Sequence, residues 1–321
     1  MPDESNFLLL PYTYVVEQEK LRWLLEVGYV MGSKHGGVLV SGERGTAKST
    51  IARSFANMMR GKAPVTLPIN ATDDRVVGGW RINSLMDGKL EPEISLLEQA
   101  DEAGMLYIDE VNLLDDHIVN LILDVVSTGL LVLERDGIDK EVAVSFMLVG
   151  TMNPDEGALR PQLLDRFGLF TKVEAERDSE VRRKILRTVL TFDIERDKSA
   201  SSWLREGRER DRERRERIER ARARLKHVDL TEETIGLCAR VATEFEVVGH
   251  RAEIVMAQAA RAAAALDNRT RTIPEDVWWV APHAVMHRRR RAAYADGYTW
   301  SDEDTDRLGR IIPGAQLSQE A

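Results

Sequence analysis

The sequence predicts an α/β protein in which a parallel sheet lies between helices, followed by a smaller helical domain. Up to about residue 190, apolar runs of strand length alternate with helical patterns, which is typical of a parallel sheet covered on both faces. From residue 229 onward, apolar residues recur at helical spacing. We therefore expect an α/β domain over residues 1–190, with strands at 37–41, 64–70, 104–109, 144–151 and 169–174.

The first expected strand runs into a loop that has the composition of a phosphate-binding site. A helical pattern follows the loop over residues 51–59. This order points backbone N–H groups and a helix N-terminus at phosphate groups. The pattern normally has glycine before the lysine, whereas Ala47 stands here and its methyl group restricts the backbone. The residues expected to surround a nucleotide are Gly42, Glu43, Arg44, Gly45, Thr46, Ala47, Lys48, Ser49 and Thr50.

The third expected strand ends in two adjacent carboxylates, Asp109 and Glu110. Nucleoside triphosphatases with a phosphate loop use an acid at a strand end to hold Mg²⁺, and a following glutamate can deprotonate the attacking water. The alternative is structural, because acids also gather before helices. The phosphate loop upstream favours the functional interpretation.

Two segments between the strands are longer than a simple crossover needs. Residues 72–103 predict an insertion with a turn at Asp87-Gly88-Lys89, before Pro92. Residues 130–145 contain two β-prone runs around Asp136-Gly137, which predicts a projecting hairpin.

The sequence changes character after the α/β domain. Residues 191–228 are dominated by Arg and acids and predict a solvated connector helix with an apolar edge at Ile218, Ala221 and Leu225. The interleaved acids argue against the alternative of an arm for nucleic acid. Four i,i+4 pairs stand in the favourable order: Glu206/Arg210, Asp211/Arg215, Glu213/Arg217 and Glu216/Arg220.

Residues 229–291 predict a helical domain. Thr231 is an expected N-cap, a second helix covers 251–266, and Thr272 with Glu275 predicts a capping box for a third. The basic cluster at 287–291 suits the end of that helix, with anion or partner contact as the alternative. Residues 292–321 predict a loosely held acidic tail.

Composition excludes several classes of protein. The net charge of −9 disfavours a broad, sequence-blind grip on nucleic acid. The single cysteine, Cys238, excludes a disulfide framework or a cysteine-based metal site. No apolar run is long enough to insert into a membrane. The N-terminus lacks the pattern of a secretory signal, so we expect a cytoplasmic location, or the plastid stroma in a photosynthetic eukaryote.

Three stretches identify a family resemblance: Asp109-Glu110-Val111-Asn112-Leu113-Leu114-Asp115-Asp116-His117, the run from Gly150-Thr151-Met152-Asn153-Pro154 to Leu164-Asp165-Arg166-Phe167-Gly168, and His250-Arg251-Ala252-Glu253-Ile254. Together with the loop they resemble the I subunit of magnesium chelatase, an AAA+ ATPase, over nearly the whole chain. The resemblance implies an AAA+ P-loop core with a five-stranded parallel sheet and a C-terminal helical lid.

The resemblance also implies roles for individual residues. Lys48 would contact the β- and γ-phosphates of ATP, Ser49 and Asp109 would hold Mg²⁺, and Glu110 would activate water. Asn153 resembles the sensor-1 residue, with a cap before Pro154 as the alternative. Arg166 resembles the arginine finger that reaches a neighbouring subunit, with a local ion pair as the alternative. Arg251 resembles the sensor-2 arginine, with a solvated helix residue as the alternative. Glu17 stands where such proteins commonly have glycine.

The function implied is that of an ATP-hydrolysing motor in a homo-oligomeric ring, most simply a hexamer. Its partners would be an AAA+ subunit with a von Willebrand-type domain and a large porphyrin-binding subunit that inserts Mg²⁺ into protoporphyrin IX, toward chlorophyll or bacteriochlorophyll. A cobalt chelatase motor for corrinoids would share nearly every motif. A MoxR-like chaperone fits the 159–168 stretch less well, and a DNA-translocating helicase would want a more basic hairpin tip. A scaffold that binds ATP without hydrolysing it is disfavoured by Lys48, Asp109, Glu110 and Arg166.

Overall fold

The computed structural model describes residues 9–79, 93–135, 138–198, 200–289 and 298–314. Five strands form one parallel sheet in the order β2-β3-β6-β1-β7, which confirms the predicted α/β fold. The strands are β1 (Val38–Gly42), β2 (Val65–Leu67), β3 (Met105–Ile108), β6 (Met147–Met152) and β7 (Leu169–Val173). The second strand is shorter than predicted, and the expected turn at 87–89 lies outside the described residues.

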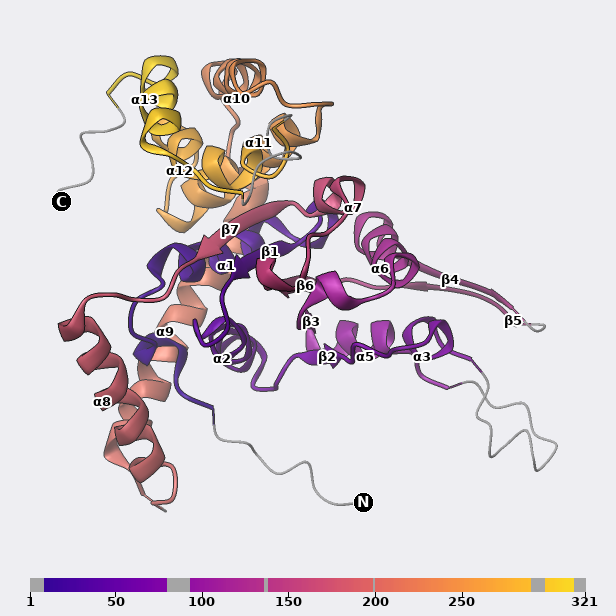
Figure 1. The fold of residues 1–321 in the computed structure, drawn as a ribbon, viewed down its shortest axis with the longest axis vertical. Helices are drawn as coiled ribbons and strands as arrows, with labels where there is room; N and C mark the ends of the chain where they lie inside the picture. The colour runs from indigo at the N-terminus through magenta and orange to yellow at the C-terminus, as the bar shows by residue number, and fades with distance from the viewer. Residues whose placement is uncertain (1–8, 80–92, 136–137, 199, 290–297, 315–321) are drawn as a thin grey trace.

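Helices cover both faces of this sheet (Figure 1). On one side lie α1 (Glu19–Met31) and α2 (Lys48–Arg60), and on the other lie α5 (Leu96–Ala103), α6 (Asp116–Thr128) and α7 (Pro161–Arg166). Successive side chains of a strand point to opposite faces. Accordingly, Val38 and Val40 of β1 enter the core with α1 and α2, whereas Leu39 enters the core with α5 and α6.

The segment before β3 begins with the short helix α3 (Asp73–Val77). Between α6 and β6, the strands β4 (Leu130–Arg135) and β5 (Ile138–Ala143) pair antiparallel, from Leu130 opposite Ala143 to Arg135 opposite Ile138. This hairpin projects from the body of the molecule at the α6 end (Figure 1).

Two helices follow the sheet, α8 (Ser179–Glu195) and the charged helix α9 (Ser202–Arg224). The predicted apolar edge of α9 is buried at Ile218 and Ala221, while Leu225 is half-buried. Of the four predicted pairs, Glu206–Arg210 and Glu216–Arg220 form, at 2.6 and 3.7 Å. Most residues of α9 are exposed to solvent, and a polar face around Asp211 is packed in addition to the apolar edge.

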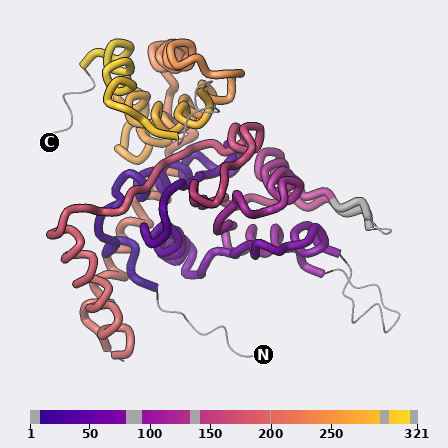
Figure 2. The backbone as a smooth tube through the Cα atoms, viewed as in Figure 1, coloured from indigo at the N-terminus to yellow at the C-terminus, as the bar shows by residue number. Residues whose placement is uncertain are grey.

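This polar face of α9 contacts the N-terminal segment around the turn η1 (Tyr12–Tyr14), which lies beside α9 (Figure 2). The Asp211 carboxylate accepts hydrogen bonds from the backbone N–H groups of Tyr12, at 2.9 Å, and Thr13, at 2.8 Å, and from the Thr13 hydroxyl, at 2.7 Å. One turn further on, Arg214 forms a bidentate contact with the buried carboxylate of Glu26 in α1. Tertiary partners therefore replace the predicted partner of Asp211 within the helix.

The lid consists of α10 (Glu232–Glu244), α11 (Arg251–Leu266), α12 (Pro274–Val285) and α13 (Asp302–Ile311). Thr231 caps α10 as predicted, accepting from the Thr234 N–H at 3.2 Å. The Thr272–Glu275 capping box is wrong: Asp276 accepts from the Ile273 N–H at 2.9 Å instead. Thr272 is buried and contacts the Thr234 hydroxyl at 2.9 Å, so it serves the contact between two lid helices.

Buried polar contacts fix the lid to the end of the sheet. His283 Nδ1 lies 2.9 Å from the Phe170 carbonyl oxygen of β7, and burial lowers the pKa of this imidazole to about 4. Arg288 is 5% exposed and donates to the Gly168 carbonyl at 2.9 Å and to Asp165 Oδ1 at 3.0 Å. Part of the basic cluster thus joins the lid to α7, while residues 290 and 291 lie outside the described residues. Within the described ranges, no helix is both long and apolar enough to cross a membrane.

Replacing Asp211 with alanine should leave the Tyr12 and Thr13 N–H groups without their acceptor in a buried setting. We expect a loss of about 2–4 kcal/mol in the free energy of unfolding, measured by denaturant titration. Glu209→Ala is the matched control, because Glu209 lies on the same helix and, among the residues that the structure describes, pairs with the exposed Arg212 alone. It should change stability by no more than about 0.5 kcal/mol. Equal losses for the two variants would contradict the assigned role of Asp211.

Candidate functional site

The loop between β1 and α2 closes on itself. Lys48 Nζ donates to the carbonyl oxygens of Gly42 and Glu43, at 2.5 and 2.7 Å, and the Thr46 hydroxyl donates to the Glu43 carbonyl at 2.8 Å. Ala47 has a φ of 62°, in the left-handed region that the missing glycine would adopt freely. The alanine therefore preserves the shape of the loop, at a cost of about 1–2 kcal/mol in backbone strain.

At the end of β3, several hydroxyl groups surround Asp109. The Thr151 hydroxyl, from the neighbouring strand β6, donates to Asp109 Oδ1 at 2.7 Å, and the Tyr107 hydroxyl donates to the same oxygen at 2.9 Å. Tyr107 Oη also lies 2.9 Å from Ser49 Oγ, on the first turn of α2. One buried hydroxyl therefore joins the predicted carboxylate to the predicted serine.

Sequence reasoning missed Tyr107 and Thr151. Tyr107 has no exposed surface, and burial raises the pKa of its hydroxyl to about 12, so it stays protonated as a donor. An aromatic residue inside a buried strand is normally part of the core. The available signal was its spacing: Tyr107 and Asp109 are two apart in an extended segment and point to the same face.

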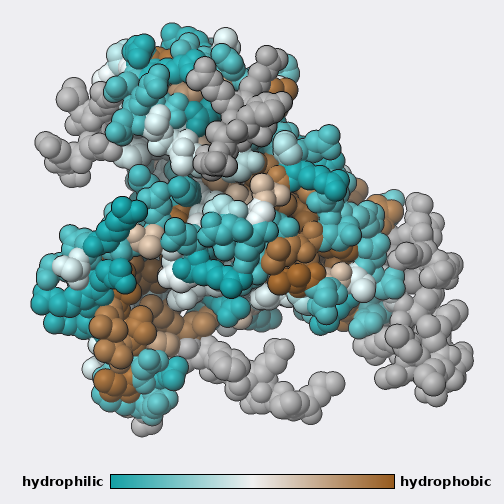
Figure 3. All heavy atoms as spheres, in the orientation of Figure 1, coloured by the Kyte–Doolittle hydropathy of each residue, from teal (hydrophilic) through white to brown (hydrophobic). Residues whose placement is uncertain are grey.

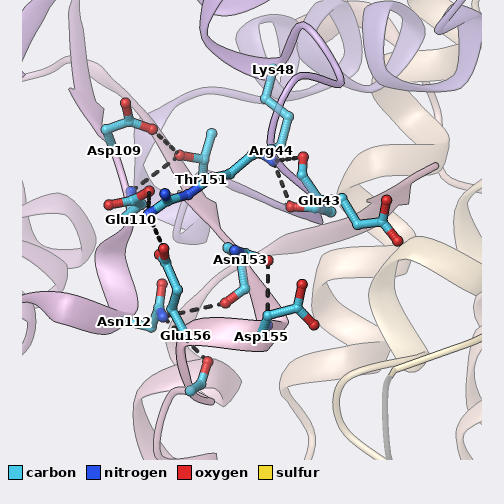
Figure 4. Close-up of polar contacts among 12 residues, drawn as sticks. Glu43, Arg44, Lys48, Asp109, Glu110, Asn112, Thr151, Asn153, Asp155 and Glu156 are labelled. Atoms are coloured by element: carbon cyan, nitrogen blue, oxygen red, sulfur yellow. Dashed lines mark hydrogen bonds and ion pairs between the residues drawn. The ribbon is translucent and has the colours of Figure 1, made fainter. Parts of the chain in front are cut away.

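Glu110 directly precedes the short 3-10 turn η3 (Val111–Leu113) and has a φ of 53°. Its carboxylate lies 3.5 Å from Arg44 Nη2, and the same guanidinium pairs with Glu156 of the turn η4 (Pro154–Glu156) (Figure 4). Glu156 was not predicted as a site residue. Arg44 thus offsets the repulsion between two carboxylates at the mouth of the loop.

The surroundings of Lys48 have opposing effects on the pKa of its ammonium group. Burial lowers the pKa of the Lys48 ammonium, while the carboxylates of Asp109, Glu110 and Glu156 act in the opposite direction. The loop lysine and the carboxylates at the strand end therefore belong to one electrostatic cluster.

Asn153 follows β6 and is 6% exposed. Its Oδ1 accepts from the Asp155 N–H at 3.3 Å, which is the local capping contact before Pro154 (Figure 4). The side chain thus makes the structural contact while also lying at the edge of the sheet that carries Asp109.

The two arginines of interest lie outside this cluster. Arg166, at the end of α7, donates to Asp124 Oδ1 of α6 at 2.6 Å. Arg251, the first residue of α11, lies 3.7 Å from Asp165 Oδ2. In the described part of the chain, neither guanidinium forms a hydrogen bond or ion pair with the loop at 42–50.

Within the same described ranges, no group of three or more His, Cys, Asp and Glu side chains is arranged to hold a metal ion. The atoms that could bind a metal ion here are oxygens. They are the Asp109 carboxylate, the Thr151 and Tyr107 hydroxyls that contact it, and the Ser49 hydroxyl that contacts Tyr107. Such a set suits a hard cation that takes its remaining ligands from phosphate and water.

Comparison with known proteins agrees with this arrangement. The model of the AAA domain (dynein-related subfamily) matches residues 37–167, and that of the AAA lid domain matches residues 236–308. A Cytophaga hutchinsonii protein assigned as an ATPase has a solved structure with a TM-score of 0.66 and 18% identity, covering 94% of this chain and 92% of that one. That likeness supports the fold alone.

Relatives with near-full-length matches show which family of AAA+ proteins the chain belongs to. The chain is 35% identical to magnesium-chelatase subunit ChlI of Olisthodiscus luteus, over 88% of this chain and 91% of the relative. It is 37% identical to the magnesium-chelatase 38 kDa subunit of Rhodobacter capsulatus, over 88% and 89%. An uncharacterized protein of Mycobacterium tuberculosis is 40% identical over 89% of this chain, which spans only 46% of that protein's length. With near-complete mutual coverage of the two chelatase subunits, this chain belongs to the magnesium-chelatase I-subunit family of AAA+ ATPases.

Proposed function

We propose that this chain binds ATP with Mg²⁺ at the loop and strand-end cluster and hydrolyses it as the motor subunit of a metal chelatase. The observation that carries the proposal is the junction of Lys48, Ser49 and Asp109 at one edge of the sheet, with Ser49 and Asp109 each 2.9 Å from the same Tyr107 hydroxyl. Family membership supports the same conclusion.

The residues fit a magnesium ion bound together with phosphate. Ser49 and Asp109 would hold it, and their shared contact with Tyr107 keeps the two oxygens close to each other. Bound Mg²⁺ supplies positive charge beside the phosphates. Lys48, which donates to the Gly42 and Glu43 carbonyls, would turn to the β- and γ-phosphates, where an ammonium group is better satisfied.

Hydrolysis requires a base near the terminal phosphate, and we assign that role to Glu110. Its carboxylate would accept a proton from the attacking water, and Asn153 would orient that water from the adjacent strand. The Arg44 guanidinium contacts both Glu110 and Glu156. Glu110 must therefore exchange the Arg44 contact for water before it can act.

Tyr107→Phe tests whether the hydroxyl positions the two magnesium ligands. We expect the Mg²⁺ concentration for half-maximal ATPase activity to rise about 10-fold, because an outer contact to a ligand is lost. ATP affinity without Mg²⁺ should change less than about 2-fold. The control is Tyr29→Phe, which removes a hydroxyl that donates to Glu219 at 2.7 Å, outside the cluster. The same Mg²⁺ dependence in both variants would remove Tyr107 from this role.

Arg166 would complete the site of a neighbouring copy in a homo-oligomeric ring, with six copies as the simplest arrangement for this family. Its guanidinium pairs with Asp124 and forms no hydrogen bond or ion pair with the loop of its own chain in the described residues. An arginine supplied from another subunit places positive charge where the transition state gathers negative charge. Arg251, at the start of the lid, would contact the nucleotide of its own chain when the lid closes.

Mixing two inactive variants tests a shared site. Arg166→Ala should lower the rate of ATP hydrolysis by at least about 1000-fold while nucleotide binding persists. Lys48→Ala should also be inactive, with weakened binding. Mixed rings contain seams that combine an intact loop from one copy with an intact Arg166 from the other, so part of the activity should return. A mixture that stays as inactive as its components would argue for a site contained within one chain.

The work of this motor would be metal insertion into a tetrapyrrole, performed on a partner. We propose Mg²⁺ and protoporphyrin IX as substrates, with an AAA+ subunit bearing a von Willebrand-type domain and a large porphyrin-binding subunit as partners. The two named chelatase relatives support this assignment. A cobalt chelatase complex for corrinoids would use the same motor residues with different partners.

Reconstitution with each set of partners tests the assignment. With magnesium-chelatase partners, ATP and protoporphyrin, we expect the absorbance of the magnesium porphyrin to appear. Glu110→Gln should bind ATP normally and yield no product, because the proton acceptor is missing; Glu102→Gln, exposed on α5, should act like wild type. Activity only with cobalt-chelatase partners would overturn the magnesium assignment, and stimulation by neither set would overturn the chelatase function.

A further inference from the structure

The helix α8 presents an apolar stripe that the rest of the described chain does not cover. Leu186, Val189, Leu190 and Ile194 are 59%, 45%, 52% and 62% exposed. Their spacing of three and four residues puts them on one side of the helix. Figure 3 shows the corresponding hydrophobic patch at the α8 end of the molecule.

The helix itself is well formed. Asp178 caps it by accepting from the N–H groups of Glu180 and Val181, at 2.7 and 3.3 Å. Yet none of its 17 residues is buried, and none belongs to either hydrophobic core. Since helical stability in proteins comes mainly from packing an apolar face, this face needs a partner.

The position of α8 indicates where that partner lies. The helix follows β7, the edge strand whose Val173 pairs with Gly42 at the start of the phosphate loop. On the opposite side of the molecule lie α6, α7 and the hairpin (Figure 1). Arg166 is on that opposite side. A second copy that brings its Arg166 to the loop of the first therefore also brings its α6 end toward α8.

Charge on the two surfaces is complementary. Arg182, Arg183, Lys184 and Arg187 surround the beginning of the stripe on α8. Among the described residues, Lys184 and Arg187 form no hydrogen bond or ion pair. The helix α6 carries Asp116 and Asp124 and contains no Lys or Arg; within the same chain, Asp116 pairs with Arg160 and Asp124 pairs with Arg166. Lys184 and Arg187 would lie beside Asp124 once Arg166 leaves that carboxylate for the neighbouring loop, which favours docking in one orientation.

Apolar surface is also present at the α6 end. Leu113, just before α6, is 42% exposed, and Leu130 and Val132, on the strand that follows it, are 44% and 47% exposed. A head-to-tail contact uses two different surfaces of the same chain and can close into a ring.

We propose that the apolar stripe of α8 packs against the α6 end of a second copy of this chain, at the seam to which that copy contributes Arg166. This inference rests on the proposed ring and adds the surface that holds its subunits together. Burial of the four apolar side chains would stabilise the contact between the two copies. This contact would then position Arg166 at the neighbouring loop.

Disrupting the stripe separates assembly from nucleotide binding. Leu190→Glu should lower the fraction of chains in the oligomer at least about 10-fold. Sedimentation velocity with a non-hydrolysable ATP analogue and Mg²⁺ measures this fraction, and the affinity of a single chain for the analogue should not change. The matched control is Val248→Glu, on the lid, where the residue is 62% exposed. Circular dichroism verifies that both variants fold. Unchanged assembly of Leu190→Glu beside an assembling wild type would overturn this inference and leave the ring proposal intact.

Cross-linking identifies the surface that α8 meets. Leu190→Cys and Ser127→Cys, the latter exposed on α6, are mixed with the analogue and a short bis-maleimide; the native Cys238 is buried. We expect pairs containing one chain of each kind. Pairs of two Leu190→Cys chains alone would show a symmetric contact between α8 helices and overturn the head-to-tail docking. A wild type that remains a single copy with nucleotide would overturn the ring itself.

Discussion

The parallel pairing of β6 with both β1 and β3 is the constraint on which the site depends. Its register sets Val40 opposite Thr151 and Ile108 opposite Gly150, so the carboxyl ends of the three strands meet at one edge. The phosphate loop, Asp109 and Asn153 lie at that edge, because they directly follow β1, β3 and β6 in the sequence. A slip of one residue in β6 would turn Thr151 to the other face of the sheet and remove its hydroxyl from Asp109.

The same edge concentrates strain and charge. Ala47 and Glu110 both have positive φ, and carboxylates gather beside Lys48 and Arg44. Strained backbone of this kind persists where the surrounding structure holds it in place. Here the hydrogen bonds from Tyr107 and Thr151 to Asp109 fix the position of the carboxylate at the end of β3.

The contacts of α7 connect the lid to the proposed seam between subunits. Asp165 accepts contacts from Arg251 and Arg288 of the lid, and the adjacent Arg166 pairs with α6. A change in lid angle would therefore act on the residue beside the proposed arginine finger. In domain closure around a ligand, the hinge residues commonly lie at the ends of helices or strands. In the proposed ring, a movement of α6 would also displace α8 of the neighbouring copy.

The strands, the loop and the acidic strand end could be predicted because their signals are local: apolar runs, a glycine-containing turn and adjacent carboxylates. The partners of Tyr107, Asp211 and Thr272 could not, because each depends on a segment far away in the sequence. Asp211 has an arginine four residues later and still bonds to the N-terminal segment. Pairing within a helix is weak, and a buried backbone N–H that needs an acceptor outweighs it.

The central claim is that hydrolysis takes place between copies of this chain. The most direct measurement is the rate of ATP hydrolysis per chain over a dilution series that crosses from assembled to single-copy protein. We expect the rate per chain to fall steeply as the oligomer dissociates, while binding of a non-hydrolysable analogue to the dilute chain persists. A rate per chain that stays constant down to the single copy would contradict this claim.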